Sequence, residues 1–321
     1  MEAFSKKGYR VVVVATVLSG FDVERTVPEG VEFVDWSIKK AGMNPFADIG
    51  ALWRLWVLLT QIRPHIVFSH TAKAVILGLI VSYCRGVPRR TAMIPGLGYA
   101  FAEGSGARRR IARAIATWGY RAALSNAHTV IFQNEDDRQR LISLGVLRKS
   151  VPSFIVRGSG IDMERFPDAP HPPGPPVFLM VARLLKDKGV YEFVAAARKV
   201  KCKVPEARFV LVGGGDANPS SVSQSEVEEW VREGVVEARG HLENTQPEYA
   251  ACHVFVLPSY YMEGCPRVNL EAMSTGRAII TTDWVGCRET VRHGENGILV
   301  APRDVDALAG AMLAIALIRP L

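Results

Sequence analysis

The sequence predicts an α/β protein made of two doubly wound domains that face each other across a cleft. Short apolar runs rich in β-branched residues recur along the chain, with helical segments between them, as in parallel sheets. One proline-rich stretch interrupts this alternation, which then restarts. The length of 321 residues leaves room for two domains of ordinary size.

The first half of the chain contains three clear strand candidates. They are the apolar runs RVVVVAT at 10–16, HIVFS at 65–69 and HTVIFQ at 128–133. A helix is expected to begin after Asn44, which suits the N-cap, with Pro45 at the first helical position. Because the three runs are continuously apolar, we expect each strand to be buried on both faces of its sheet.

The best domain boundary is the stretch DAPHPPGPP at 168–176, where four of the last five residues are proline. Proline can continue neither a helix nor an inner strand. We therefore predict domains at 1–168 and 177–321, joined by a hinge at 169–176. The second domain is predicted to have strands at 177–182, 208–213, 235–239, 254–259 and 278–282, and helices at 189–204, 227–234 and 266–274.

The composition is that of a globular protein with a sizeable core, since 48% of residues are hydrophobic and 22% are charged. The five cysteines are scattered, without CxxC pairs or zinc-type spacing, so we expect reduced thiols in a cytosolic protein. The longest apolar stretch, at 74–84, is well short of the roughly 20 residues that span a bilayer.

The net charge of +7 is unevenly distributed along the chain. Residues 1–165 contain 23 Lys and Arg against 13 Asp and Glu, whereas residues 166–321 contain 16 against 19. A basic first half indicates an anionic partner such as a phosphate, a lipid headgroup or a nucleic acid. No aromatic–basic RNA motif accompanies this charge, so nucleic acid is not expected as a partner.

Two glutamates eight positions apart, Glu263 and Glu271, flank a predicted loop-to-helix transition. Glu263 is expected at the carboxyl end of a strand, and Glu271 more than one turn into the following helix. The N-terminus of that helix carries a partial positive charge that attracts phosphate. This layout suits a nucleotide sugar, with its ribose, diphosphate and sugar. A lone pair of glutamates, however, more often consists of a solvated loop residue and a helix-surface residue.

The segment PSYYMEGCPRVNLEAMSTGRAIITT resembles the E-x7-E region of the retaining glycosyltransferases of family 4, which have the GT-B fold. The resemblance runs from about Gly8 to Ala309, and GLGYAF and IFQNEDD are most similar to enzymes that add hexose or N-acetylhexosamine to polyprenyl-diphosphate-linked saccharides. By comparison with the family, a first strand and a last, crossing helix are expected to be missing from this sequence. The other matching motifs are ARLLKDKGV, LVGGGD, GCRETVRHGENGILV, SHTAKA and GSGIDMERF.

The resemblance implies a role in donor binding for several positions. Arg183 and Lys188 would hold the donor diphosphate in place of a metal ion; without the resemblance, both would be taken for solvated surface groups. Glu271 would bind the ribose hydroxyls, and Glu263 would contact the donor sugar or lie near its anomeric carbon. The diphosphate and sugar would be lined by the backbone around Gly264, Cys265, Arg267 and Val268.

Residues of the first domain would complete the site. His70 would reach the cleft from the end of its strand and bond to a hydroxyl of the sugar, although a histidine at a strand end is more often structural. In GLGYAF, Gly96 and Gly98 allow close backbone approach. Together with Tyr99 they would shape the acceptor side.

The implied reaction moves a sugar from a nucleoside-diphosphate donor, with UDP expected, to a lipid-linked saccharide, with retention and without cofactor or metal. No double-displacement nucleophile is assignable, and a front-face route would use the departing diphosphate to help deprotonate the acceptor. Two alternatives stay open. One is another GT-B enzyme, such as a nucleotide-sugar epimerase or a glycosyltransferase with a soluble acceptor. The other is an inactive fragment or regulatory subunit that only binds nucleotide.

The segment ARRRIARAIATWGYRAAL at 107–124 predicts a helix with a strongly basic surface. Its arginines are expected to bind an anionic membrane, each contributing about 1 kcal/mol, which would place the enzyme at the inner face of the cell membrane. Its apolar stripe is expected to be buried in the core, as in most surface helices. The stripe consists of Ile111, Ile115, Trp118 and Ala122, and the arginines are Arg108, Arg109, Arg110, Arg113 and Arg121.

Overall fold

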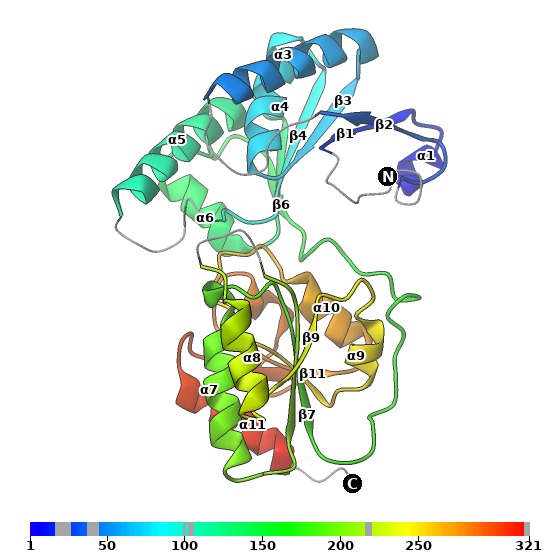
Figure 1. Cartoon of the computed structure of the whole chain (residues 1–321). Coiled ribbons are helices and arrows are strands. Elements are labelled where there is room, and N and C mark those ends of the chain that lie inside the picture. The colour runs from blue at the N-terminus through cyan, green and yellow to red at the C-terminus, as the bar shows by residue number, and fades with distance from the viewer. Residues whose placement is uncertain (17–26, 37–44, 99–100, 102–105, 216–219, 318–321) are drawn as a thin grey trace. The chain divides into compact units, whose positions relative to one another are not determined.

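The computed structural model describes residues 1–16, 27–36, 45–98, 101, 106–215 and 220–317 (Figure 1). These residues form two compact units. The first unit consists of Met1–Met93, Trp118–Val130 and Val146–Pro152, and the second of Ile94–Thr117, Ile131–Gly145 and Ser153–Leu321. The domain boundaries read from the proline-rich stretch stay a prediction.

The second unit contains a parallel sheet of six strands in the order β12-β11-β10-β7-β8-β9. Helices cover both faces, with α7, α8 and α11 on one side and α9 and α10 on the other (Figure 1). The strands are β7 (Val177–Val181), β8 (Arg208–Val212), β9 (Glu237–Gly240), β10 (Val254–Leu257), β11 (Ala278–Thr282) and β12 (Gly297–Val300). The helices are η2 (Lys186–Lys188), α7 (Val190–Lys201), α8 (Gln224–Arg232), α9 (Gln246–Ala250), α10 (Arg267–Ser274), η3 (Cys287–Thr290) and α11 (Val305–Leu317).

This order is the doubly wound arrangement expected from the sequence. The first strand of the sheet, β7, lies in the middle, and the chain builds outward first through β8 and β9 and then through β10, β11 and β12. Every residue of β7 and β10 is buried, as predicted for parallel strands covered on both faces. The core around them includes the stacked rings of Phe178 and Phe209, whose centroids lie 5.1 Å apart.

The remaining elements belong to the preceding part of the chain. Parallel strands β1 and β2 form a two-stranded sheet, and a four-stranded sheet has the order β3-β4-β5-β6. The strands are β1 (Val11–Ala15), β2 (Val31–Asp35), β3 (Ile66–His70), β4 (Arg89–Ile94), β5 (Thr129–Phe132) and β6 (Ser153–Ile155). The helices are α1 (Glu2–Ser5), α3 (Pro45–Ile62), α4 (Ala72–Cys84), α5 (Ala107–Leu124) and α6 (Glu135–Ser143).

The strand positions at 10–16, 65–69 and 128–133 are confirmed, but complete burial is wrong for all three. In β5 only Val130 and Phe132 are buried, and Thr129 and Ile131 are half-buried. All residues of β1 are only half-buried, and in β3 the side chains of Ile66 and Phe68 are exposed. The reason is local. In the described residues, β1 pairs with β2 alone and β3 with β4 alone, so each lacks a strand on its other edge. The helix begins at Pro45 as predicted, whereas its N-cap Asn44 lies outside the described residues.

Helix α5 has the predicted bounds, but its apolar stripe is not buried. Ile111, Ile115 and Trp118 are 57%, 53% and 72% exposed, so the expectation that this stripe packs into the core is wrong. The buried positions of α5 are Gly119, Tyr120, Ala123 and Leu124 instead, and a Cβ atom at Gly119 would lie 3.1 Å from the side chain of Ile76 in α4. In the described part of the chain, no helix combines the length and the apolarity that crossing a bilayer requires.

Candidate functional site

The predicted donor-binding residues gather where the order of the six-stranded sheet reverses. Strands β7 and β10 are neighbours, and the chain leaves them toward opposite edges of the sheet. The carboxyl ends of such a strand pair leave a crevice in which α/β proteins bind ligands. The loop after β7 carries Arg183 and Lys188, and the loop after β10 carries Glu263 and leads into α10.

Lys188 and Glu263 form an ion pair at the centre of this region. The Lys188 Nζ atom lies 2.5 Å from Glu263 Oε1, and the two side chains are only 11% and 17% exposed. The hydroxyl of Ser259 donates a second hydrogen bond, of 3.1 Å, to the same carboxylate oxygen. Neither residue is therefore a solvated surface group. Removing one partner of such a pair costs on the order of 3–5 kcal/mol, because it leaves the other charge buried and unpaired.

The local backbone explains how Lys188 comes to lie beside Glu263. Lys188 ends the short helix η2, and Gly189 follows with φ of +79°. A Cβ atom at Gly189 would lie 2.2 Å from the carbonyl oxygen of Pro258, so only glycine permits this approach of the two loops. Both cations lie near the aromatic ring of Tyr261, with the Arg183 guanidinium 5.9 Å and Lys188 Nζ 5.2 Å from its centroid.

Glu271 lies on α10, and a buried tyrosine holds its carboxylate. The hydroxyl of Tyr249 donates to Glu271 Oε2 at 2.9 Å, and Arg267 Nε lies 3.4 Å from Oε1. Burial, together with the nearby carboxylate, raises the pKa of Tyr249, so its hydroxyl stays protonated and remains a donor. Glu271 is thus fixed from its buried side, and it is not a solvated helix-surface residue.

Gly264 is the most crowded glycine of the site. A Cβ atom at this position would lie 1.6 Å from the carbonyl oxygen of Pro95 and 2.4 Å from Gln133 Oε1. Gly96 is packed against the same segment, because its own Cβ would lie 2.8 Å from the backbone nitrogen of Gly264. Gly98 has a φ of +64° and open space around it. Tyr99 lies outside the described residues.

The other predicted donor contacts surround the start of α10. Arg267 is exposed, and Val268 is half-buried against the core. Burial raises the pKa of the Cys265 thiol to about 12, and the charges of Glu289 and Glu263 add to this shift. The thiol is therefore protonated at neutral pH and is a poor nucleophile. That Cys265 contributes to donor binding through its backbone stays a prediction.

His70 lies in the first unit, at the end of β3. Although the side chain is exposed, partial desolvation by the surrounding protein lowers the pKa of its imidazole, which favours the neutral form at pH 7. The next residue, Thr71, has φ of +76°, a conformation that is strained for a β-branched residue. Backbone strain of this kind is concentrated at functional sites.

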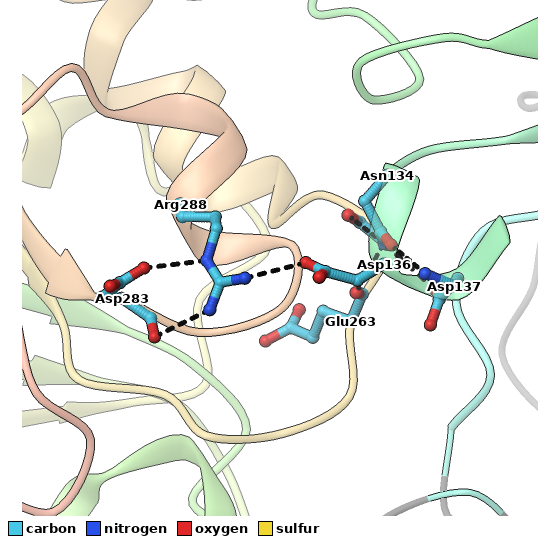
Figure 2. A network of polar contacts seen from close by, with 7 residues as sticks. Asn134, Asp136, Asp137, Glu263, Asp283 and Arg288 are labelled. Atoms are coloured by element: carbon cyan, nitrogen blue, oxygen red, sulfur yellow. Dashed lines mark hydrogen bonds and ion pairs between the residues drawn. The ribbon is translucent and has the colours of Figure 1, made fainter. Parts of the chain in front are cut away.

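A polar network that the sequence did not reveal lies beside the Glu263 loop (Figure 2). Arg288 Nη1 donates to Asp136 Oδ2 at 3.0 Å, and its Nε donates to Asp283 Oδ1 at 2.8 Å. Asn134, the residue before α6, donates from its side chain to the carbonyl oxygens of Glu263 and Gly264. Figure 2 shows the Glu263 carboxylate pointing away from Asn134.

Sequence reasoning missed Tyr249, Ser259, Tyr261 and Asn134 as parts of this site. Asn134 gave one signal, because an Asn before three acidic residues is a typical N-cap, and it does cap α6. Nothing in the sequence indicated that the same side chain also binds another loop. Tyr249 lies 22 residues before Glu271, and no spacing rule relates positions that far apart.

Comparison with known proteins identifies the family. Residues 175–317 match the family described as glycosyl transferases group 1, and residues 1–152 match the one described as glycosyl transferase 4-like domain. Together the two matches span most of the chain.

Individual relatives agree with this assignment. The chain is 28% identical over 297 residues to the N,N'-diacetylbacillosaminyl-diphospho-undecaprenol alpha-1,3-N-acetylgalactosaminyltransferase of Campylobacter jejuni, covering 87% of this chain and 75% of the relative. It is 27% identical over 280 residues to the UDP-Gal:alpha-D-GlcNAc-diphosphoundecaprenol alpha-1,3-galactosyltransferase of Escherichia coli, covering 83% of this chain and 70% of the relative.

The fold also has close counterparts among solved structures. The Anabaena protein HepE, in complex with UDP and glucose, superposes with a TM-score of 0.71 over 99% of this chain and 84% of that one, at 20% identity. This likeness shows the fold, which is GT-B as the sequence predicted. With its fold, its motifs and both family matches in agreement, the chain belongs to the group 1, family-4-like glycosyltransferases and is a glycosyltransferase.

Proposed function

We propose that this enzyme transfers a hexose or N-acetylhexosamine from a UDP-sugar to a polyprenyl-diphosphate-linked saccharide during cell-surface polysaccharide synthesis, with retention at the anomeric carbon. The main observation in support is the buried ion pair of Lys188 and Glu263. It lies in the loops after β7 and β10, where the strand order of the sheet reverses, and Glu271 lies further along α10. These side chains offer one partner for each part of a nucleotide sugar: Lys188 for the diphosphate, Glu263 for the sugar and Glu271 for the ribose.

The ion pair suits the bond that must break. In a nucleotide sugar, the anomeric carbon is joined to a phosphate oxygen, so positive charge develops on carbon while negative charge develops on oxygen. A cation and a carboxylate 2.5 Å apart offer stabilisation for both at adjacent positions. Lys188 and Arg183 would therefore stabilise the leaving diphosphate, and Glu263 the sugar. The departing diphosphate would help to deprotonate the acceptor on the same face.

The remaining donor contacts follow from α10. Glu271, held by Tyr249, would accept hydrogen bonds from the ribose hydroxyls. The N–H groups at the beginning of the helix have no intrahelical partner and would face the diphosphate. The backbone around Gly264, Cys265, Arg267 and Val268 would line the diphosphate and the sugar. Binding of diphosphate by these groups would require no metal ion.

The donor and acceptor classes are supported by what similar proteins are named for. The Escherichia coli relative is named for UDP-Gal, and HepE was crystallised with UDP and glucose. Both named transferases act on sugars linked to undecaprenol through diphosphate. We extend these classes to the present chain. In it, His70 would bind a sugar hydroxyl, and the loop with Gly96, Gly98 and Tyr99 would shape the acceptor side.

A lipid-linked acceptor requires the enzyme to approach a membrane, and α5 suits that task. Its exposed Ile111, Ile115 and Trp118 provide an apolar stripe, and the exposed Arg110 and Arg121 lie on the same helix. Such a helix can lie in the interface of an anionic leaflet. We therefore propose peripheral attachment to the inner face of the cell membrane.

The experiment that tests the function is calorimetric titration with UDP-, GDP- and ADP-sugars, followed by turnover with lipid-linked and soluble acceptors. Binding of UDP-sugars and transfer to lipid-linked saccharide in the presence of EDTA are expected. Turnover with a soluble acceptor, or epimerised donor, would support the other enzymatic alternative. UDP binding without any turnover would indicate a nucleotide-binding subunit, and loss of activity in EDTA restored by magnesium would contradict the metal-free route.

A further inference from the structure

The side chain of Asn134 joins α6 to the loop that carries Glu263. Its Nδ2 atom donates to the carbonyl oxygen of Gly264 at 2.9 Å and to that of Glu263 at 3.2 Å (Figure 2). Asn134 is fully buried, and all these residues belong to the second unit. Because a buried polar group is costly to leave unpaired, a fully buried amide that faces two consecutive carbonyls is a strong constraint on that loop.

The orientation of the Asn134 amide is fixed by its other partners. Its Oδ1 atom accepts from the backbone N–H of Asp137 at 2.7 Å, which caps α6. Its Nδ2 atom also lies 3.1 Å from Asp137 Oδ2. One end of the amide therefore faces a donor and the other faces acceptors only, so a flipped amide would be repelled at both ends. The side chain can hold the loop in one way only.

Glycines enclose the same two carbonyls from other directions. A Cβ atom at Gly286 would lie 2.5 Å from the Glu263 carbonyl oxygen and 2.7 Å from that of Gly264. Gly96 and the carbonyl of Pro95 pack against the nitrogen and Cα of Gly264. The loop is thus closely packed on the sides that face Gly286, Gly96 and Pro95, and the Asn134 amide supplies hydrogen bonds to its two carbonyls.

Fixing the carbonyls also fixes the N–H groups that follow them. In a trans peptide the N–H points opposite to the carbonyl, so with both carbonyls turned to Asn134 the N–H groups of Gly264 and Cys265 point away from it. The Glu263 side chain leaves the same segment toward Lys188. We propose that Asn134 is a positioning residue for transfer, holding the Glu263–Gly264 peptide so that the Glu263 carboxylate and these N–H groups meet the donor sugar, an inference that rests on the proposed donor site.

The test uses variants of Asn134 that still cap α6 but no longer donate hydrogen bonds from Nδ2 to the two carbonyls. Serine and aspartate both cap helices well. In Asn134→Ser the side chain is too short to donate to the two carbonyls. In Asn134→Asp a carboxylate oxygen replaces Nδ2 and faces only other oxygens, those of Asp137 and the two carbonyls. We expect kcat with a UDP-sugar and lipid-linked acceptor to fall about 10- to 100-fold in Asn134→Ser and further in Asn134→Asp. The UDP Kd, set mainly at Glu271, should change less than about threefold.

A second measurement makes the result independent of turnover. Backbone hydrogen exchange of residues 262–268 should be at least about tenfold faster in Asn134→Ser than in wild type, while exchange in β7 and α8 is unchanged. Faster loop exchange with reduced kcat supports the proposal. Unchanged loop exchange, or faster exchange with wild-type kcat, overturns it. If wild type transfers no sugar but the variant loop still exchanges faster, the proposed donor chemistry fails and the holding of the loop by Asn134 is supported.

Discussion

The six-stranded sheet of the second unit and the two-stranded sheet of the first are built from similar sequences but differ in burial. VFLMV forms β7 with every residue buried, whereas VVVVA forms β1 with every residue half-buried. Strand β7 has β10 and β8 as neighbours; in the described residues, β1 has β2 alone. An apolar run therefore predicts a strand, but the burial of that strand depends on what surrounds it.

The same contrast, between buried and exposed residues, separates the proposed donor site from the proposed membrane-binding surface of α5. The proposed donor site lies among loops that are closely packed at Gly189, Gly264 and Gly286, so its chemistry is expected to depend on that packing. The stripe on α5 depends on side chains that are not covered. Changes at the donor site should therefore alter turnover and donor affinity, whereas changes on α5 should alter only where the enzyme binds. The following predictions test this contrast, from the largest expected effect to the smallest.

Gly264→Ala is expected to have the largest effect. The new methyl group would lie 1.6 Å from the Pro95 carbonyl oxygen, so one of the two loops must move. We expect kcat/KM to fall more than about 100-fold, equivalent to roughly 2.7 kcal/mol, and the melting temperature to fall as well. Gly310→Ala in α11 is the matched control, because a Cβ there meets nothing within 4 Å. Equal activity of the two variants would contradict the close packing described.

Glu271→Gln is expected to weaken UDP binding by about 1.5–3 kcal/mol, because a charge-assisted contact to the ribose becomes a neutral one. Calorimetric titration with UDP gives the affinity directly. Glu263→Gln is the informative comparison, since it should reduce turnover more than UDP affinity. An unchanged UDP Kd in Glu271→Gln would refute the ribose assignment.

The sequence predicted those parts of the proposed site whose residues lie close together along the chain. Motif matches with the family predicted Lys188, Glu263 and Glu271 because those residues lie in short segments at fixed spacing. The order of strands and helices in the second unit was predictable for a similar reason, since period and composition are local. The bond from Tyr249 to Glu271 joins distant positions, and only the fold brings them together.

Burial on the first half of the chain was less predictable. The pattern on α5 gave the correct helix bounds and grouped Ile111, Ile115 and Trp118 on one face. It did not show whether that face was covered, because amphipathic periodicity only indicates that one face differs from the other. A stripe beside several arginines is therefore ambiguous between a core face and a membrane face until neighbouring elements are placed.

Asp137→Asn is expected to stabilise the second unit at alkaline pH. Burial raises the pKa of Asp137 to about 6, with the Asn134 amide opposing the shift. Since the folded pKa exceeds the unfolded one, this carboxyl favours folding below about pH 4 and loses that contribution as pH rises through 6. Asparagine removes the charge and still accepts from Asn134.

We therefore expect Asp137→Asn to be about 1–3 kcal/mol more stable than wild type at pH 8 and to lose most of this advantage near pH 4. Urea unfolding at both pH values measures the difference. Asp136→Asn is the matched control on the same helix turn, because Asp136 is partly exposed and pairs with Arg288 instead. An advantage of equal size at both pH values would mean that titration of Asp137 is not its cause.

The smallest expected effect is on the surface of α5. Arg110→Gln removes one exposed cation beside the apolar stripe and should weaken binding to phosphatidylglycerol vesicles about fivefold, or roughly 1 kcal/mol. Co-sedimentation at low and high salt measures this, and salt should remove the difference because it screens the charge. Arg232→Gln, an exposed arginine on α8, is the matched control and should bind as wild type does.

Trp118→Ser tests the apolar contribution separately, because loss of an exposed indole that would enter the leaflet should lower vesicle binding at both salt concentrations. Turnover with a short-chain, water-soluble acceptor should stay at the wild-type level in both α5 variants, because neither changes the donor site. If Arg110→Gln and Arg232→Gln lowered vesicle binding equally, attraction would come from the net charge of +7 and not from this helix. That result would refute the assignment of α5 as the membrane-binding surface.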